Sequence, residues 1–341
     1  MNKLVAVLSV IAISAVALSV WLIKDQNNDE ISPNLLFADL QTYAHQIENV
    51  EIRNGQGVLF NAHKLSDSWL ATFDAEQDVY PISQDKLANF IATLMTAKLV
   101  EAKTKKPENY SRLGLQAIDA DDSLATQVVI KGANKTWQLL VGNKVSASEG
   151  QYILKPNDQQ SWRTDKTIRL PMDKFSWLKQ PILPYVSKDI TSVSRIDGEN
   201  WQIVRAQDNS LQLANMPKNK ELQYQGILGS IINNITSLDF ERLLPIQNEF
   251  AQTLKLLTQL EVSTADNHIF QVVVSERDDK YFVNFSANNQ TEYWQNWYYQ
   301  ISHFSAQQLI KTLDEFLATE STEPTLDSTN QQHLDEGDSP H

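Results

Sequence analysis

The sequence of 341 residues contains no cysteine. This absence excludes disulfide bonds, thiolate nucleophiles and metal sites built on cysteine ligands, and it is compatible with an oxidising compartment. Glycine is also scarce, with 10 residues, and neither a glycine-rich phosphate loop nor a Gly-x-Ser-x-Gly motif occurs. The absence of these motifs excludes a P-loop NTPase and favours a protein that is not an enzyme.

Basic residues are too few for a nucleic-acid-binding protein, because 29 Lys and Arg face 42 Asp and Glu and give a net charge of −13. Binding to phosphate backbones requires a basic surface, and no stripe of Lys and Arg stands out. We therefore expect no nucleic acid as a partner. Six acidic residues and no Lys or Arg follow residue 317, and the tail at 319–341 has too little apolar surface to fold.

Histidines and clustered carboxylates give no metal signature. The densest carboxylate group, Asp119, Asp121 and Asp122, lacks the Asp-x-Asp-x-Asp-Gly pattern of a calcium loop. The histidines lack spacing such as His-Glu-x-x-His. We expect structural or solvated roles for both groups, with no catalytic residue, no metal and no cofactor. The six histidines are His45, His63, His268, His303, His333 and His341.

Long hydrophobic runs are absent except at the N-terminus. Leu4–Ile23 is a run of 20 residues without a charge, and as a helix it would span the roughly 30 Å hydrocarbon core of a bilayer. The run predicts a transmembrane anchor, with the lipid bilayer as a partner through residues 4–23. A cleavable signal peptide with a small-residue site at 15–17 is the alternative, but the apolar run continues past it.

The residues that flank this run indicate its orientation. Lys3 and the amino terminus lie on one side and Lys24 on the other, which favours a cytoplasmic N-terminus. No later segment is long and apolar enough to span a membrane. We therefore predict a single-pass protein of the bacterial inner membrane, with the bulk of the chain in the periplasm.

Behind this run, one series of strand and helix signals occurs first at residues 47–97. Asn54-Gly55 is a hairpin signal, and residues 57–62 and 68–73 have strand composition. Ser83 is placed to cap a helix with an apolar stripe wide enough to lie on a sheet. The stripe consists of Leu87, Phe90, Ile91, Leu94 and Ala97.

The same series returns in the second half at a nearly constant distance. The offset is 143 from Gly55 to Gly198, 142 from Trp69 to Leu211 and 141 from Leu87 to Leu228. Farther on, residues 126–141 align with 258–274, and residues 150–155 with 279–284, at an offset of about 130. The second helical stripe consists of Leu228, Ile231, Ile232, Ile235 and Leu238.

These signals predict an α+β protein, in which an N-terminal transmembrane helix precedes two tandem repeats of an antiparallel sheet packed on a helix. Each repeat would have the order β-β-β-α-β-β-β, although chance similarity between amphipathic patterns is the alternative. A short helix is expected near Trp177, and Ser305 is expected to cap a last helix. The predicted parts are 1–30 (anchor and flank), 31–46 (lead-in), 47–170 (first repeat), 171–189 (linker), 190–318 (second repeat) and 319–341 (disordered acidic tail).

The segment 291–302 is dense in aromatic residues. Such rings can stack on sugars or anchor a partner, so Tyr293, Trp294, Trp297 and Tyr298 are a candidate binding surface. In the alternative interpretation the segment is a strand that fills the core, with Trp297 and Tyr299 on one face and Tyr298 on the other.

Several short motifs occur in a fixed order along residues 80–183. They are YPIS, LVEAK, NYSRLGL, WQLLVGN, GQYILK and FSWLKQPIL. In this order they resemble DUF4340, a family of bacterial membrane-anchored proteins, best over residues 47–190 and more loosely beyond. The resemblance includes an aromatic-x-x-x-Gly-Leu turn at Tyr110, Gly114 and Leu115, where we expect a positive φ at the glycine and a buried leucine.

The resemblance implies a role beside a transport system. Many family members look like accessory, extracytoplasmic parts of ABC-type export systems of the gliding-motility kind, and no catalytic residue carries over. We therefore expect a membrane-anchored scaffold or binding subunit whose partner is an envelope membrane protein. The alternative is an extracytoplasmic protein that binds a glycan or small ligand through the aromatic segment.

Overall fold

The computed structural model describes residues 34–73, 78–146, 148–198, 200–287 and 292–318. Over these residues the fold is mixed α+β, with two antiparallel sheets and few helices. Two compact units divide the chain, the first built mainly from residues before Leu183 and the second mainly from Leu183 onward. None of the described helices is long and apolar enough to cross a bilayer. The predicted anchor at 4–23 and the predicted acidic tail at 319–341 lie outside the described residues.

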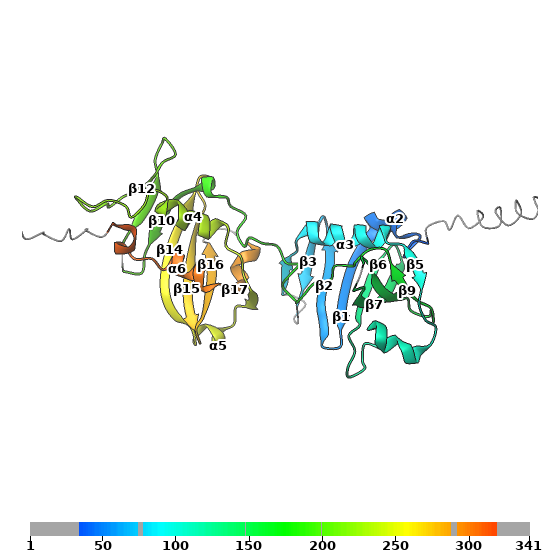
Figure 1. Cartoon of the computed structure of the whole chain (residues 1–341). Helices are drawn as coiled ribbons and strands as arrows, with labels where there is room; N and C mark the ends of the chain where they lie inside the picture. Colours follow the sequence, from blue (N-terminus) through cyan, green and yellow to red (C-terminus); the bar gives the residue numbers. More distant parts are fainter. Residues whose placement is uncertain (1–33, 74–77, 147, 199, 288–291, 319–341) are drawn as a thin grey trace, which may run out of the picture. The chain divides into compact units, whose positions relative to one another are not determined.

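The first unit contains a nine-stranded sheet (Figure 1). Its strands are β1 (Ile47–Asn54), β2 (Gly57–Leu65), β3 (Ser68–Thr72), β4 (Val79–Pro81), β5 (Leu99–Ala102), β6 (Thr126–Gly132), β7 (Lys135–Lys144), β8 (Gln151–Leu154) and β9 (Ser161–Thr164). They lie side by side in the order β4-β3-β2-β1-β6-β7-β8-β9-β5. The short helix α2 (Leu40–Tyr43) and a 3-10 turn at Ala44–Gln46 lead into β1.

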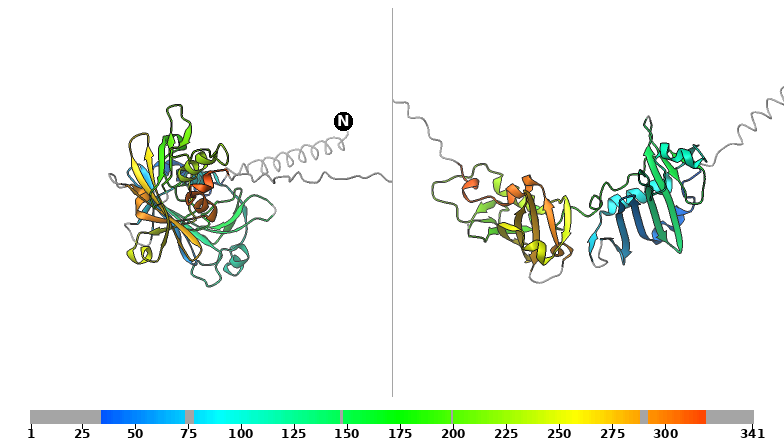
Figure 2. Two further views of the ribbon diagram at one scale, coloured as in Figure 1. Left: turned by 90° about the vertical axis from the view of Figure 1, so that its left-hand side faces the viewer. Right: turned by 90° about the horizontal axis from the view of Figure 1, so that it is seen from below.

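Helix α3 (Gln84–Thr96) crosses the first sheet (Figure 2). The predicted apolar stripe is confirmed, because four of its members are buried and Ile91 is half-buried. Trp177 fills the space between helix and sheet, with its ring 5.0 Å from the rings of Phe60 in β2 and Phe90 in α3. Burial of each large apolar side chain contributes about 1.5–3 kcal/mol to the free energy of unfolding, so the stripe fixes the helix on the sheet.

The turn at Gly114 follows a 3-10 segment at Pro107–Leu113 and has the predicted geometry. Gly114 has φ 67° and Leu115 is buried. A Cβ atom at Gly114 would lie 2.5 Å from Oδ1 of Asn143, so both the backbone conformation and the lack of space require glycine there. The Tyr110 hydroxyl donates a hydrogen bond of 2.6 Å to the carbonyl of Gln159. These contacts give the turn a structural role.

A second sheet has eight strands and is built mainly from the second unit (Figure 1). Its strands are β10 (Ile190–Arg195), β11 (Gln202–Arg205), β12 (Leu211–Leu213), β13 (Arg242–Pro245), β14 (Lys255–Thr264), β15 (Ile269–Arg277), β16 (Lys280–Ala287) and β17 (Trp297–Ile301). The helices are α4 (Ile227–Thr236), α5 (Asn248–Ala251) and α6 (His303–Leu309). The strand order is β12-β11-β10-β14-β15-β16-β17-β13, which is the order of the first sheet without an equivalent of β4.

The pairing registers of the two sheets also correspond. Val50 pairs with Ala62 and Ile130, and Val193 pairs with Ile203 and Val262. In both units the register shifts within the first three residues of the first strand, and a 3-10 turn precedes that strand. Residues 143 apart in the first strands, and 141 apart in the second strands, therefore occupy equivalent positions.

Several sequence predictions about local structure need correction. Residues 171–182 contain no helix, and Trp177 belongs to the core of the first unit. Ser83 is at the N-cap of α3, but its side chain makes no capping hydrogen bond. The last helix begins at His303 and is capped by Ser302, whose side chain accepts from the Ser305 amide at 3.1 Å.

Strand number and hairpin geometry also differ from the prediction. Five strands, not three, follow the main helix in each unit, because an edge strand directly follows the helix and another strand ends the series. In the first hairpin the positive φ of 121° falls on Gly57 and not on Gly55. The pairing of Asn54 with Gly57 explains this shift, since Asn54 is the last residue of β1 and not a turn residue.

Candidate functional site

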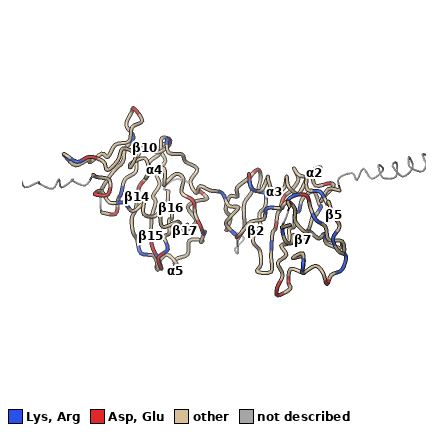
Figure 3. The backbone as a smooth tube through the Cα atoms, in the orientation of Figure 1, with Lys and Arg blue, Asp and Glu red and all other residues tan. Residues whose placement is uncertain are grey.

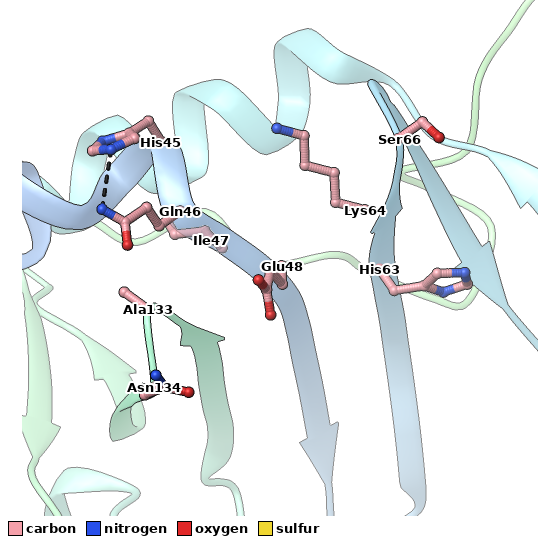
Figure 4. A pocket seen from close by; sticks show the side chains of 9 residues that line it. All are labelled: His45, Gln46, Ile47, Glu48, His63, Lys64, Ser66, Ala133 and Asn134. Atoms are coloured by element: carbon pink, nitrogen blue, oxygen red, sulfur yellow. Dashed lines mark hydrogen bonds between the residues drawn. The ribbon is translucent and has the colours of Figure 1, made fainter.

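A polar hollow of about 750 Å³ opens on the first unit (Figure 4). Three elements of the sheet meet there: the 3-10 turn and start of β1, the end of β2 with the turn to β3, and the turn from β6 to β7. The sheet brings these elements together because β1 lies between β2 and β6. The lining residues are His45, Gln46, Ile47, Glu48, His63, Lys64, Ser66, Ala133 and Asn134.

The lining side chains are mostly polar and leave their hydrogen-bonding groups available. Lys64 supplies a positive charge and Glu48 a negative one, and both side chains are exposed. Only His45 and Gln46 are joined to each other, through a contact of 3.1 Å between Nε2 atoms (Figure 4). A hollow that offers imidazole, amide, ammonium and carboxylate groups can bind a polar partner through several hydrogen bonds.

The equivalent place in the second unit is closed by Arg205. Its guanidinium donates to the carbonyl oxygens of Ile190 (2.9 Å), Ser187 (2.8 Å) and Asn209 (3.2 Å). Arg205 is the counterpart of Lys64 in the strand pairing. Asn49 pairs with His63, the residue before Lys64, and the equivalent Ser192 pairs with Val204, the residue before Arg205. A guanidinium can bridge several carbonyls with its fixed fork of donors, whereas an ammonium is a single point of donation.

A second cluster closes the β14–β15 turn beside Arg205. The Tyr185 hydroxyl lies 3.1 Å from Nδ1 of His268, and Asp266 lies 3.4 Å from the same nitrogen. Burial raises the pKa of the Tyr185 hydroxyl, and nearby Asp266 raises it further. A hydrogen bond from Thr264 lowers the pKa of Asp266. This position is therefore filled by contacts within the unit, and the open hollow is a feature of the first unit.

The sequence of the chain matches one known protein family. A sequence model of the family described as "Domain of unknown function (DUF4340)" matches residues 69–259, more than half of the chain. The chain belongs to the DUF4340 family. The match begins in β3 and ends in β14, so it covers part of each unit of the DUF4340 chain, whereas the resemblance in the sequence is best over 47–190. No curated protein and no solved structure is significantly similar to the chain.

The aromatic segment of the DUF4340 chain lies in the core of the second unit. Trp294, Trp297 and Tyr298 are 1%, 3% and 8% exposed, so they present no open ring face for stacking. Tyr293 is half-buried, and its burial, with the nearby Glu292 carboxylate, raises the pKa of its hydroxyl to about 12. The burial argues against a binding surface here and agrees with the alternative interpretation of core packing.

Both faces of the aromatic strand are covered. Tyr299 packs against Phe285 at a ring distance of 5.7 Å, while Tyr298 packs against Phe250 of α5 at 5.3 Å. The two tyrosines thus point to opposite faces, as the alternation of a strand requires. Helix α5 covers the face of the strand that carries Tyr298, which the alternation of residues in the sequence did not assign to the core.

The remaining candidate residues are separated in the fold. Asp119, Asp121 and Asp122 are exposed in a turn region between Gly114 and β6. Across the described ranges no group of three His, Asp or Glu side chains is arranged to hold a metal ion. His333 and His341 lie outside the described residues.

His45 and His63 line the same hollow, although sequence reasoning treated the histidines as scattered. The sequence held part of the signal for the place of His63, because an antiparallel hairpin fixes which residues face each other. Counting back from the pairing of Asn54 with Gly57 places His63 opposite Glu48, and the register shift between Ile52 and Arg53 moves it to Asn49. The contribution of the β6–β7 turn had no comparable signal, since it depends on β1 pairing with β6, a strand more than 70 residues farther along the chain.

Proposed function

We propose that the DUF4340 chain is a membrane-anchored extracytoplasmic scaffold or binding subunit, an accessory component of an ABC-type transport system in the bacterial inner membrane. The observation that carries the proposal is the uncharged run Leu4–Ile23 directly ahead of two folded units. A membrane anchor raises the effective concentration of the folded units near a membrane-protein partner. We propose no catalytic role.

The hollow of the first unit is the place we assign to the envelope partner. It supports this role because its charged side chains are exposed and because the equivalent place in the second unit is occupied by Arg205. A partner with its own hydrogen-bonding groups can bond to the polar side chains of the hollow, as Arg205 bonds to carbonyl oxygens in the second unit.

The two units are, in this proposal, tandem copies of one ancestral unit. The common strand order and the register shift at the start of β1 and β10 support duplication, since chance similarity of amphipathic patterns does not produce a matching irregularity. Two copies provide more contact area than one. Divergence of Lys64 and Arg205 would then leave one copy for binding and one for structure.

Photocrosslinking in membranes of the native host tests the proposal. A photoreactive amino acid replaces Lys64 at the hollow, and in a matched control it replaces Lys218, an exposed lysine of the second unit. Crosslinked products are identified by mass spectrometry. We expect a permease or ATPase subunit of a transporter from the Lys64 position and not from the Lys218 position.

Two results would overturn the proposal. If the full chain is not retained in the membrane fraction, the anchor is wrong. If the chain is retained but neither position yields a transporter subunit, the scaffold role is wrong.

A role in binding a glycan or small ligand is the second candidate. Burial of the aromatic segment removes the platform first assigned to it, but the amide of Asn134 and the carboxylate of Glu48 in the hollow are groups that bind hydroxyls. We expect retention of the full chain on cell-wall glycan to fall in the variant with Glu48→Ala and Asn134→Gly, with an unchanged Tm, because glycine tolerates the positive φ of 56° at residue 134. No retention of the unaltered chain would argue against this role.

A further inference from the structure

A basic surface lies next to β5, the strand at the end of the order of the first sheet, with Lys98 directly before the strand and Lys105 and Lys106 after it. Lys98, Lys105 and Lys106 are exposed there, and Val100 is 47% exposed between them. We call these four residues the β5 edge. From residue 98 to residue 112 the chain carries five Lys or Arg and two Glu, a net charge of +3 in a protein whose total is −13. Figure 3 shows Lys and Arg positions beside β5.

Two carboxylates lie next to this surface and neither forms an ion pair with its three lysines: the Asp165 carboxylate accepts a hydrogen bond of 2.7 Å from the Lys98 backbone amide, and Glu101 has other partners. Glu101 is occupied by Lys103 at 2.5 Å and by Arg163 at 3.0 Å. Lys98, Lys105 and Lys106 form no ion pair with any residue in the described part of the chain. Their charges are therefore available to an external anion.

The chain approaches the β5 edge directly from its N-terminal side. The Leu99 amide donates to the carbonyl of Asn34, the first described residue, at 2.8 Å, and the Leu36 amide donates to the carbonyl of Ala97 at 2.8 Å. Ten residues separate Ile23 from Asn34, and a fully extended chain of that length covers at most about 35 Å. If residues 4–23 cross the bilayer, Asn34 and the adjacent start of β5 are held within about that distance of its surface.

We infer that the β5 edge docks on an anionic phospholipid surface. This inference rests on the anchor of the proposed function. Lysines beside an exposed apolar residue suit an interface in which the ammonium groups meet lipid phosphates and the aliphatic parts meet the acyl boundary. Near an anionic surface each lysine strengthens the attraction about fivefold, over a range of roughly 8–10 Å at physiological salt.

The absence of cysteine permits a direct test on the full chain. Val100→Cys introduces a unique thiol for a fluorescent label, and the labelled chain is reconstituted in nanodiscs of phosphatidylcholine alone or of phosphatidylcholine with phosphatidylglycerol. A lipid with a quencher in its headgroup reports contact. The control label is at Phe304→Cys, an exposed position of the second unit. We expect quenching at residue 100 in the anionic nanodiscs, reversed by high salt, and none at residue 304.

Charge reversal sharpens the test. The triple change Lys98→Glu, Lys105→Glu and Lys106→Glu should reduce quenching at residue 100 to its value in neutral lipid, because the attraction falls on the order of a hundredfold or more. Lys218→Glu should leave it unchanged. The salt dependence of the unaltered lysines provides the same information if the triple variant does not fold.

The outcomes separate this inference from the proposed function. A chain that is not retained in nanodiscs overturns the anchor and the inference with it. A retained chain whose label shows no quenching, or equal quenching in neutral and anionic lipid, overturns the docking of the β5 edge and leaves the anchored scaffold intact.

Discussion

Lys64 in the first unit and Arg205 in the second unit occupy the same place in the same strand order, yet they have different consequences. Lys64 is exposed beside an open hollow, whereas Arg205 joins the start of β10 to the turn after β11 through three carbonyl oxygens. The same position of the sheet thus carries an exposed ammonium group in one unit and a guanidinium that bridges three carbonyl oxygens in the other. We therefore expect binding at the unit whose side-chain hydrogen-bonding groups have no partner within the unit.

In the first hairpin the two units differ in the opposite way: a position that is apolar in the first unit carries a charged side chain in the second. Ile52 is fully buried in the first unit, and its equivalent Arg195 forms an ion pair with Asp197 at 2.7 Å, with side chains only 10% and 9% exposed. Arg195 also donates to the carbonyls of Ile310 and Lys311 at 3.1 Å. The second unit therefore ties its C-terminal segment to its sheet with a buried charge, where the first unit uses apolar packing.

The largest difference between the units is expected from this ion pair. Asp197→Ala breaks an ion pair in which both side chains are about nine-tenths buried, and removal of one partner of such a pair costs about 3–5 kcal/mol of the free energy of unfolding. At the equivalent position of the first unit, Asn54→Ala removes one exposed contact to the Gln56 amide and should cost about 1 kcal/mol or less. Urea unfolding followed by hydrogen exchange in peptides of each unit measures both. A loss below 1 kcal/mol for Asp197→Ala would contradict the buried-pair argument.

Two glycines give effects of opposite sign. Gly114→Ala in the first unit forces a side chain into a left-handed conformation against Asn143 and should cost about 2 kcal/mol. Gly229→Ala lies within α4 of the second unit, where a Cβ atom meets only Leu211 at 3.8 Å, and it should stabilise by about 0.5–1 kcal/mol. Thermal unfolding of the two variants measures the signs, and equal signs would show that one of the two local environments is misjudged.

An exchange of the two equivalent side chains tests the closed and open positions. Arg205→Lys loses the fork that bridges Ser187 and Ile190 and should cost about 1–2 kcal/mol. Lys64→Arg changes an exposed side chain and should alter stability by no more than about 0.5 kcal/mol. Faster hydrogen exchange at the start of β10 in the first variant is the specific readout. Unchanged exchange there would mean that Arg205 does not hold the turn.

The smallest expected effect concerns Asp39, which meets Lys135 at 2.5 Å and the Trp137 indole nitrogen at 2.8 Å in the first unit. Hydrogen bonds from Lys135 and Trp137 lower the pKa of the Asp39 carboxyl below its ordinary 3.8. Its contribution is thus present above pH 3.8 and is lost as the pH falls through the lower folded value. The pair is exposed, so the contribution is below about 1 kcal/mol.

Acid titration of stability measures this contribution. Asp39→Asn should lose stability near neutral pH and approach the unaltered chain as the pH falls below the folded pKa. Asp121→Asn, at an exposed aspartate of the first unit, is the control. An Asp39→Asn variant with an unaltered pH profile would show that the ion pair contributes nothing measurable.

Local periodicity was sufficient to predict the helices and much of the register. The stripes that begin at Leu87 and Leu228 are buried as predicted, because a period of 3.6 residues places an apolar face on one side of a helix wherever it packs. Trp69 and Leu211, aligned at an offset of 142, are equivalent in the sheets, since Trp69 pairs with Lys64 and Leu211 pairs with Arg205.

The alignment failed by one residue where the backbone is irregular. Residues 150–155 were aligned on 279–284, which places Ile153 on Phe282, whereas pairing to Val141 and Val274 makes Ile153 equivalent to Val283. A slip of one residue exchanges the two faces of a strand. Its cause is the register shift after Val141 in the first unit, which leaves no mark in composition or periodicity.

By itself the sequence determined the α+β class, the two helical stripes and the order in which the first strands follow one another, because these depend on neighbours within a few residues. Only the tertiary structure decided that Tyr298 is covered by Phe250, that His45 and His63 line one hollow, and that Arg205 closes the equivalent place. These outcomes depend on contacts between segments far apart in the chain. The exposure of a side chain depends on which distant segment packs against it, and the local sequence pattern does not specify that segment.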